Sequence, residues 1–557
     1  MMKGYEVVVI GSGFGGAVTA YELAKKGYKV CILERGPQWT SEYFPGSNKQ
    51  DLAQNLIEIL GASQLNSRGV PFREIIRKAD LLHVMEKLEK PSMWEYRAFD
   101  RMDVLTGNGV GGGSLVYANV LHRAHKEAFE KWPGGIDWSA ELEQHYSEVE
   151  QKIGTNIAIC DKSRALKKAS EKSGRGKWDF VHLAIQRPHP QMATAKAVGC
   201  STCHYGEDAP EKKEACELEN ERSYCMSCGR CVLGCKRLNR YTLDLNYIRD
   251  AVRHYGAHLY PNHEVTKIKP ITNAPPFNYL ILCDNQQRAF KAQKVVIAAG
   301  SLGSTKLLLR CKDDPDSLPN LSDKLGERFS GNGDFQGFAY NCDVTVNSSV
   351  GPTITSEVDF NPVKSIIVEE GGIPDVLAPF AAAFVPKLGL LQQLKELTLA
   401  DFVDLMSGQK KLNLAEDVTE KSMMYLCMGR AEGYGRIELS DAGDVNIVWP
   451  DSEWNKLKEF TQGLIKELEA LTAGLGGEYF SLPLWEMGKL ATVHPIGGCS
   501  MAQAKEEGVV KPNGEVFGYD NLYVADGAII PASLGVNPSL TIAALAHRIA
   551  SLIPAKT

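Results

Sequence analysis

Three glycines near the start of the chain have the spacing of a loop that binds a dinucleotide. Gly11, Gly13 and Gly16 follow the apolar, β-branched run 6–10 and precede segment 17–26, whose apolar residues recur at helical spacing. In a β-α-β unit of this kind, the first glycine permits a tight turn and the second lets the backbone approach a pyrophosphate. The third lets the helix pack close to the strand, and the N-terminus of the helix favours the charge of the diphosphate.

An acidic residue completes this motif. The run 29–33 predicts a second buried strand, and Glu34 stands directly after it. A carboxylate at this place can accept hydrogen bonds from the hydroxyl groups of an adenosine ribose. The first part of the chain therefore predicts a bound dinucleotide.

A second group of residues that could do chemistry consists of cysteines. Half of the 14 cysteines fall between residues 200 and 235, and four of them have the spacing of a ferredoxin-type iron–sulfur site: Cys225, Cys228, Cys231 and Cys235. Lys236 stands where that motif has proline. Cys200, Cys203, His204 and Cys216 lie just before these four, so a zinc site or a set of metal-free thiols are the alternatives. The spacing favours the iron–sulfur cluster, which could pass electrons one at a time to an acceptor.

The elements that must position these groups alternate between strand and helix. The run 295–299 predicts another buried strand with a helix at 302–310, and 522–527 predicts a strand that ends on an acid and a glycine. Segments 336–346 and 436–449 alternate as half-buried antiparallel strands do. We therefore predict an α/β fold with a discontinuous Rossmann-type domain and a separate antiparallel-sheet domain for the substrate. The first comprises residues 1–310 and 491–557, with a cysteine-rich insert at about 199–236, and the second comprises residues 311–490.

Composition excludes several classes of protein. The 557 residues are 44% apolar, and 62 basic against 68 acidic side chains give a net charge of -6. A chain without basic excess is not expected to bind nucleic acid. No apolar run reaches the roughly 18 residues that a membrane-spanning helix needs. The segment before the glycine loop does not read as an export signal, so we expect a cytoplasmic protein.

Four motifs together resemble the glucose-methanol-choline (GMC) flavin oxidoreductases, within them the cholesterol-oxidase-like branch. They are the Gly11–Gly16 loop with Glu34, the glycine-rich stretch 107–114 followed by Tyr117-Ala118-Asn119, the segment His494-Pro495-Ile496-Gly497-Gly498-Cys499, and Asp526-Gly527 through Gly535-Val536-Asn537-Pro538. The resemblance implies FAD, held without a covalent bond, as the cofactor. Besides the first loop and Glu34, it implies these further FAD-binding residues: Gly109, Gly113, Ser114, Asn119, Val265, Asp526 and Gly527.

The resemblance also implies two catalytic residues. His494 would orient the substrate hydroxyl group and take its proton, and Asn537 would hold the substrate oxygen beside the flavin. Cholesterol oxidases also place a glutamate over the flavin. Glu369, Glu370 and Glu420 are present in this chain, but no motif chooses among them.

The expected substrate is a hydrophobic, sterol-like alcohol. The stretch 374–397 is apolar and interrupted by prolines, which would suit a lid over an apolar substrate that also touches a membrane surface. An acceptor protein or a quinone would take the electrons if oxygen does not. The alternatives are a sugar or polyol dehydrogenase and a non-redox flavoprotein, such as an isomerase, a lyase or a decarboxylase.

Overall fold

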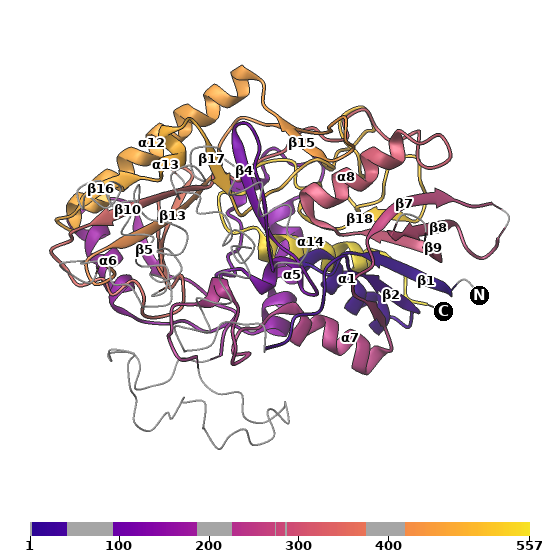
Figure 1. The fold of residues 1–557 in the computed structure, drawn as a ribbon, viewed down its shortest axis with the longest axis horizontal. Coiled ribbons are helices and arrows are strands. Elements are labelled where there is room, and N and C mark those ends of the chain that lie inside the picture. The colour runs from indigo at the N-terminus through magenta and orange to yellow at the C-terminus, as the bar shows by residue number, and fades with distance from the viewer. Residues whose placement is uncertain are drawn as a thin grey trace, which may run out of the picture.

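The computed structural model describes residues 3–41, 93–186, 225–374 and 418–556, without residues 273, 285, 286 and 362. Two sheets dominate this part of the chain (Figure 1). The predicted lid segment and the first three cysteines of the cysteine-rich region lie outside the described residues. No helix within the described ranges is both long and apolar enough to cross a membrane.

The first sheet is the mostly parallel one that the glycine motif predicts. Its order is β6-β2-β1-β9-β8-β7, and β18 pairs with β9. The strands are β1 (Lys3–Ile10), β2 (Val30–Leu33), β6 (His258–Tyr260), β7 (Val265–Pro270), β8 (Tyr279–Cys283), β9 (Arg288–Ile297) and β18 (Leu522–Val524). The central pairs are parallel, whereas β8 runs antiparallel to both neighbours. The β-branched runs of β1 and β9 suit this position because both faces of the sheet are covered.

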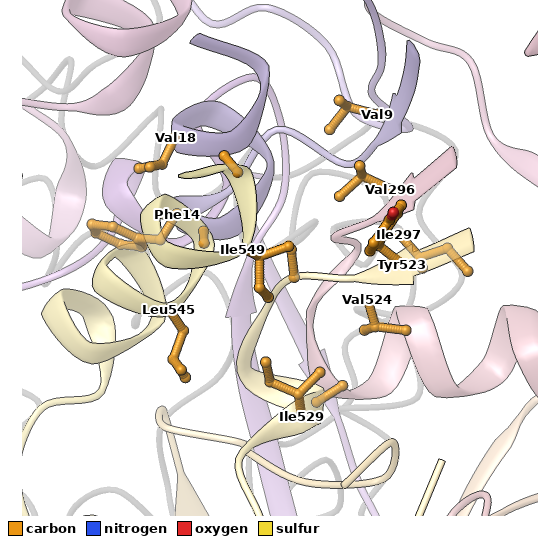
Figure 2. Close-up of a cluster of buried hydrophobic side chains, with 14 of the residues drawn as sticks. Val9, Phe14, Val18, Val296, Ile297, Tyr523, Val524, Ile529, Leu545 and Ile549 are labelled. Carbon is orange, nitrogen blue, oxygen red and sulfur yellow. The ribbon is translucent and has the colours of Figure 1, made fainter. Parts of the chain in front are cut away.

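Helices from both ends of the chain cover this sheet. α1 (Phe14–Lys25) packs against α14 (Ser539–Leu552), and α14 also contacts α5 (Trp138–Ile153). Figure 2 shows Phe14 and Val18 of α1 together with Leu545 and Ile549 of α14. Strand residues of the same core, among them Val9, Val296, Ile297 and Val524, lie beside them in this view and are buried. α7 (Tyr247–Tyr255) and α8 (Gly300–Lys312) also belong to this half.

The second sheet is antiparallel and lies on the other side of the molecule. Its order is β16-β10-β13-β12-β11-β5. The strands are β5 (Lys177–Phe180), β10 (Phe335–Tyr340), β11 (Ser356–Asp359), β12 (Ile366–Gly371), β13 (Met423–Gly429) and β16 (Glu478–Ser481). Helices α6 (Asp161–Ser173) and α12 (Asp451–Gly474) pack on it, and the short α13 (Pro483–Glu486) follows β16.

Two features of this half differ from the expectation. β5 is a strand of the second sheet, because Trp178 of β5 pairs with Val358 of β11, and α6 packs on this sheet. The residues of both elements were expected in the first domain. Segment 436–449 forms its own hairpin, β14 (Arg436–Leu439) with β15 (Val445–Val448), and does not join the second sheet. The domain boundaries themselves stay a prediction.

A small third sheet joins the two halves. It consists of β3 (Trp94–Arg97), β4 (Met102–Gly107) and β17 (Leu490–Thr492), in the order β17-β4-β3. β4 leads into the glycine-rich stretch, and β17 leads to His494. The parallel pairing of β4 with β17 therefore brings the start of these two motifs together.

Candidate active site

A cavity of about 600 Å³ lies where the loops of the first sheet meet the strands of the second. Nine of the predicted site residues line its wall: Gly11, Gly13, Glu34, Gly113, Val265, His494, Asp526, Gly527 and Asn537. Four others, Gly16, Gly109, Ser114 and Asn119, are not part of the wall. Residues from all four motifs thus meet in one space.

The first glycine loop is shaped by close backbone contacts on one side and open space on the other. Gly11 has a φ of +95°, and a Cβ atom there would overlap the carbonyl oxygen of Ala298. A Cβ on Gly16 would overlap the carbonyl oxygen of Gly11, and one on Gly15 that of Ala525. At Gly13, which precedes α1, a Cβ would meet only the Cα of Gly112 at 4.0 Å. The free side of Gly13 therefore faces the cavity.

Glu34 is held in place by hydrogen bonds to the first glycine loop and to the backbone that follows Glu34. Its carboxylate accepts hydrogen bonds from the backbone N–H and the hydroxyl of Ser12 (3.1 and 2.6 Å) and from the N–H of Gly36 (2.8 Å). Burial raises the pKa of Glu34, and these hydrogen bonds oppose the shift. Glu34 fixes the loop in place and still lines the cavity. The motif does not specify Ser12, so this residue was not predicted.

The second glycine-rich stretch contributes its backbone to the cavity. At Gly113 a Cβ would meet nothing within 4 Å. Ser114 and Asn119 are fully buried behind this wall. The hydroxyl of Ser114 donates to the carbonyl of Gly111 (2.8 Å), and Asn119 Oδ1 accepts from Arg240 Nε (2.6 Å). These two residues support the stretch.

Arg240 is a supporting residue that no motif indicated. Besides Asn119, its guanidinium donates to the carbonyl groups of Ser114, Leu115 and Tyr117 at 2.7 to 3.0 Å. A buried arginine with all these acceptors holds the glycine-rich turn in one shape.

Asp526 connects two segments at the end of β18. Its carboxylate accepts from the N–H of Gly300 (2.8 Å), the hydroxyl of Ser304 (2.5 Å) and the N–H of Ala528 (2.8 Å). Burial raises its pKa, which these hydrogen bonds oppose. Asp526 thus ties α8 to the loop after β18, with Gly527 beside it on the cavity wall.

This arrangement fits FAD. The N-terminus of α1 has no side-chain cap, and Gly13 and Gly113 leave their free sides toward the cavity, as approach to a diphosphate requires. Glu34 and Val265 lie on the same wall, where the adenosine part of the cofactor would bind. His122, which the sequence places near the glycine-rich stretch, bonds instead to Glu357.

His494 is held by a buried aspartate. Its Nδ1 lies 2.8 Å from Oδ1 of Asp334, whose Oδ2 accepts from the hydroxyl of Thr492 and the N–H of Val493, both at 2.9 Å. The N–H of His494 donates to Thr492 Oγ1 (2.9 Å). Because a carboxylate only accepts, Nδ1 carries the hydrogen and Nε2 keeps its lone pair. The histidine is therefore arranged as an acceptor of a proton at Nε2.

Asp334 was not predicted from the sequence, although its surrounding residues carry a turn signal. It ends the run Ser330-Gly331-Asn332-Gly333-Asp334 directly before β10, and such a glycine-rich polar run before a strand predicts a turn. Asn332 in the same turn accepts from the N–H groups of Leu534 and Gly535 and donates to the carbonyl of Val536. One turn therefore positions both motifs that carry the predicted catalytic residues.

Asn537 lies beside a glutamate. Its Nδ2 donates to Oε2 of Glu369 at 3.3 Å, and both residues line the cavity. Asn537 Oδ1 and Glu369 Oε1 are buried and have no hydrogen-bond partner in the part of the chain that the structure describes. Burial, and then the charge of Glu357, raise the pKa of Glu369 well above its usual value. Of the three candidate glutamates that the sequence left open, Glu369 is therefore the one that lies at the site.

The two other glutamates lie elsewhere. Glu370 points to the opposite face of β12 from Glu369, since side chains alternate along a strand. It is bound by Lys162 at 3.4 Å and by the N–H groups of Thr355 and Ser356. Glu420 is exposed.

The four predicted cysteine ligands are not confirmed as a metal site. Within the described ranges, no group of three or more His, Cys, Asp or Glu side chains is arranged to hold a metal ion. Cys228 is exposed and forms an isolated bridge with Gly351, whereas Cys231 is buried in a short 3-10 helix (Cys231–Leu233), and Cys225 and Cys235 lie between these extremes. The left-handed Ser227 (φ +56°) turns the chain between the first two cysteines. Burial, and then the charges of neighbouring thiols, raise the pKa of Cys225, so the four side chains are near one another. The iron–sulfur cluster stays a prediction that the described residues do not confirm.

Comparison with known proteins gives a family match over most of the chain. A model described as GMC oxidoreductase, for the N-terminal part of the family, matches residues 6–312, and its C-terminal counterpart matches residues 444–546. These two ranges contain all the FAD-site and catalytic residues named from the sequence.

Individual relatives and solved structures agree with this match. The chain is 28% identical to a cholesterol oxidase from Acinetobacter baumannii, over 99% of this chain and 95% of that protein. It is 23% identical to a long-chain-alcohol oxidase from Arabidopsis thaliana, over 98% of this chain and 67% of the relative. The fold is similar to that of pyridoxine 4-oxidase from Mesorbium loti, with a TM-score of 0.60, 14% identity and 99% of both chains covered.

Proposed function

Because the chain belongs to the GMC oxidoreductase family, and so is an FAD-dependent oxidoreductase acting on CH–OH donors, we propose that its substrate is a bulky, apolar, sterol-like alcohol. The observation that carries the proposal is the meeting of His494, Asn537 and Glu369 on one wall of the cavity with an apolar surface from the second sheet.

The lining from the second sheet and its flanking segments supports an apolar substrate. It includes the side chains of Ile354, Met424, Leu426 and Met428, and Val120 lies on the facing segment. Such a wall favours a hydrocarbon skeleton, while a few polar groups fix the position of the hydroxyl. A sugar would leave its many hydroxyl groups without hydrogen bonds there, which is costly. The two kinds of relative, cholesterol oxidase and long-chain-alcohol oxidase, act on alcohols of this character.

His494 takes the proton of the substrate hydroxyl group in this proposal. Nε2 is the free nitrogen, and the bond from Nδ1 to Asp334 stabilises the positive charge that the ring gains. FAD, when bound, accepts the hydride from the carbon that carries the hydroxyl group. Asp334 keeps the ring in one orientation.

Asn537 and Glu369 hold the substrate oxygen. Asn537 is fixed from one side by Glu369 Oε2, and its Oδ1 is one of the two buried acceptors without a partner among the described residues. A substrate hydroxyl group has one hydrogen, which goes to His494 Nε2 in this proposal, so its oxygen would be held by a donor, either the N–H of Asn537 or a protonated Glu369. An iron–sulfur relay is not part of this proposal, because no group of three or more His, Cys, Asp or Glu side chains in the described ranges is arranged to hold a metal ion.

The test is to mix the holoenzyme rapidly with an alcohol in the absence of oxygen. The loss of visible absorbance measures how fast the flavin is reduced. Cholesterol in detergent micelles and a long-chain primary alcohol are compared with glucose and sorbitol. We expect the apolar alcohols to bleach the flavin. Bleaching by the sugars alone would overturn the apolar substrate, and bleaching by none of them would overturn alcohol oxidation. Peroxide formed on admitting air shows whether oxygen accepts the electrons.

The role of His494 is tested with a matched pair of variants. His494→Ala should retain FAD and slow flavin reduction on the order of a hundredfold or more, the usual contribution of a positioned base. His182→Ala removes an exposed imidazole elsewhere and should leave the rate unchanged. An unchanged rate in His494→Ala would show that the histidine is not the base.

A further inference from the structure

A second buried carboxyl group stands directly behind Glu369. Glu357 in β11 is the antiparallel partner of Glu369 in β12. Residues in this relation project to the same face of a sheet, with Cβ atoms about 5 Å apart. Glu357 is 7% exposed and Glu369 is fully buried. Two carboxyl groups therefore share one region from which water is largely excluded.

Each of the two carboxyl groups has one oxygen with a hydrogen-bond partner in the described part of the chain and one oxygen without. Glu357 Oε1 lies 3.0 Å from His122 Nε2, but Glu357 Oε2 is buried without a partner among the residues described. On the neighbouring strand, Glu369 Oε2 accepts a hydrogen bond from Asn537. Glu369 Oε1 is also buried without a partner among the described residues. Two ionised groups with such free oxygens would repel each other strongly, whereas a proton on one of them removes the repulsion.

His122 is arranged to carry a positive charge. Its Nδ1 lies 2.7 Å from the carbonyl oxygen of Arg123, which can only accept, so Nδ1 carries a hydrogen. Nε2 then donates to the carboxylate of Glu357 if the ring is charged. Burial opposes this charge, but the charge of Glu357 and its hydrogen bond outweigh burial and raise the pKa of His122 to about 9.

Among the described residues, the other groups that act on Glu369 do not supply a second positive charge. Those that influence its ionisation are Glu357 from β11, His122, Glu370 on its own strand and the buried thiol of Cys427 from β13. Lys162, from α6, is bound to Glu370 on the other face of the strand. One cation thus serves two carboxyl groups on this face.

We propose that Glu357 and His122 are positioning residues that decide where the proton of this pair resides. Glu357 bears the negative charge against the His122 imidazolium, and Glu369 is a neutral carboxylic acid in the resting enzyme. Glu369 then presents an O–H group, a donor for Asn537 Oδ1 or for the oxygen of a substrate, beside the acceptor on His494. This inference rests on the proposed function in one respect only: the proposed function supplies the substrate oxygen to which this O–H group would donate.

The experiment is infrared spectroscopy of the holoenzyme, which detects the carbonyl stretch of a protonated carboxyl group. The band of Glu369 is identified by its loss in Glu369→Gln. We expect the band in the wild-type enzyme at pH 7. In Glu357→Gln, which removes the like charge, the pH at which the band is half lost should fall by about one unit or more. A wild-type enzyme without the band, or an unchanged midpoint in Glu357→Gln, overturns the proposal.

A nearby histidine provides the matched control. His125 lies 3.3 Å from Asp359 of the same strand and 5.7 Å from the ring of His122, but it does not touch Glu357. His125→Gln should leave the Glu369 band unchanged, and His122→Gln should raise its midpoint by removing the one cation. A shift of equal size in His125→Gln would mean that the effect is not specific to Glu357 and His122, and would overturn the assignment.

A second measurement does not depend on the folding of Glu357→Gln. In wild-type enzyme with labelled histidine, the NMR signal of His122 should titrate near pH 9. A neutral His122 at pH 7 overturns the proposal. Flavin bleaching by alcohols is recorded on the same samples. Bleaching without the Glu369 band refutes this inference alone, whereas the band without bleaching refutes the proposed function alone.

Discussion

The contact between His494 and Asp334 decides what the histidine can do. A free imidazole exchanges its hydrogen between both nitrogens, and only one of the two forms exposes Nε2 as a base. Asp334 removes this ambiguity, since two other donors keep its carboxylate fixed while it binds Nδ1. The residue is 3% exposed, so its charge acts in a region of low dielectric.

We predict that Asp334→Asn slows flavin reduction on the order of a hundredfold or more without loss of FAD. The amide can present N–H to Nδ1, which would then move the hydrogen to Nε2 and leave no base facing the substrate. Anaerobic rapid mixing with an alcohol that bleaches the wild-type flavin measures the rate. Asp323→Asn, at an exposed ion pair with Lys312, should behave as wild type. A wild-type rate in Asp334→Asn would contradict the orientation role.

The choice between Glu369 and Glu370 shows where prediction from the sequence ends. Both belong to one buried run, and the alternation of a strand places them on opposite faces, but which face carries the site depends on pairing with β11 and β13. That pairing joins residues far apart in the chain. His494 and Asn537 could be named because their motifs are short and local. Asp334 and Glu369 could not, since their importance arises only from contacts between distant segments.

At the scale of elements, the contact between α1 and β18 is the tightest requirement of the cofactor loop. Gly15 lies in the first turn of α1, directly against the carbonyl oxygen of Ala525, which follows β18. A side chain there would push the N-terminus of α1 away from the sheet. The diphosphate site depends on the position of this helix end.

We predict that Gly15→Ala lowers the free energy of unfolding by about 1–3 kcal/mol, as overpacking does, and weakens FAD binding. Gly463→Ala is the matched control, because it lies exposed within α12 with nothing within 4 Å of its Cβ position. There alanine should stabilise the protein by about 0.5–1 kcal/mol. Urea unfolding and titration of apoprotein with FAD measure the two effects. Full FAD affinity in Gly15→Ala would show that the helix end tolerates displacement.

Several elements of the first half follow from their residues alone. The runs of β1 and β2 and the end of β9, residues 295–297, are short, apolar and bounded by glycine or acid, and the helical spacing of α1, α5, α8 and α14 is regular. The first part of β9 and the strands β6, β7 and β8 were not predicted. β5 escaped prediction because Lys177–Phe180 is short and half exposed. The hairpin β14–β15 has the pattern of a sheet strand, and its separation from the second sheet is a matter of tertiary contacts that no local pattern encodes.

At the scale of the whole molecule, the two ends of the described chain lie together (Figure 1). Lys26, at the end of α1, donates from Nζ to the carbonyl groups of Ala550, Ser551 and Ile553 at 2.6 to 3.0 Å. These are carbonyl groups at the C-terminal end of α14, which lack partners within the helix. One cation therefore joins the first helix to the last.

We predict that Lys26→Met lowers the free energy of unfolding by about 1.5–3 kcal/mol, the range for hydrogen bonds from a charged donor. The loss should appear in urea unfolding of the apoprotein and as earlier release of flavin fluorescence from the holoenzyme. Lys25→Met removes the exposed neighbouring lysine and should change little. Equal stability of the two variants would show that the end of α14 is held by its apolar contacts alone.

The place of β18 in the first sheet has a consequence for biosynthesis. A ribosome releases β1, α1 and β9 long before residues 522–524, yet β18 pairs with β9, and Ala525 and Asp526 complete the loop contacts around the cofactor. The nascent chain therefore carries an open, apolar edge at the end of β9 while five of the six strands of the second sheet, β10, β11, β12, β13 and β16, are made. Cofactor loading must wait until β18 and Asp526 have been made, and a chain that stops before them would be a flavin-free, aggregation-prone product.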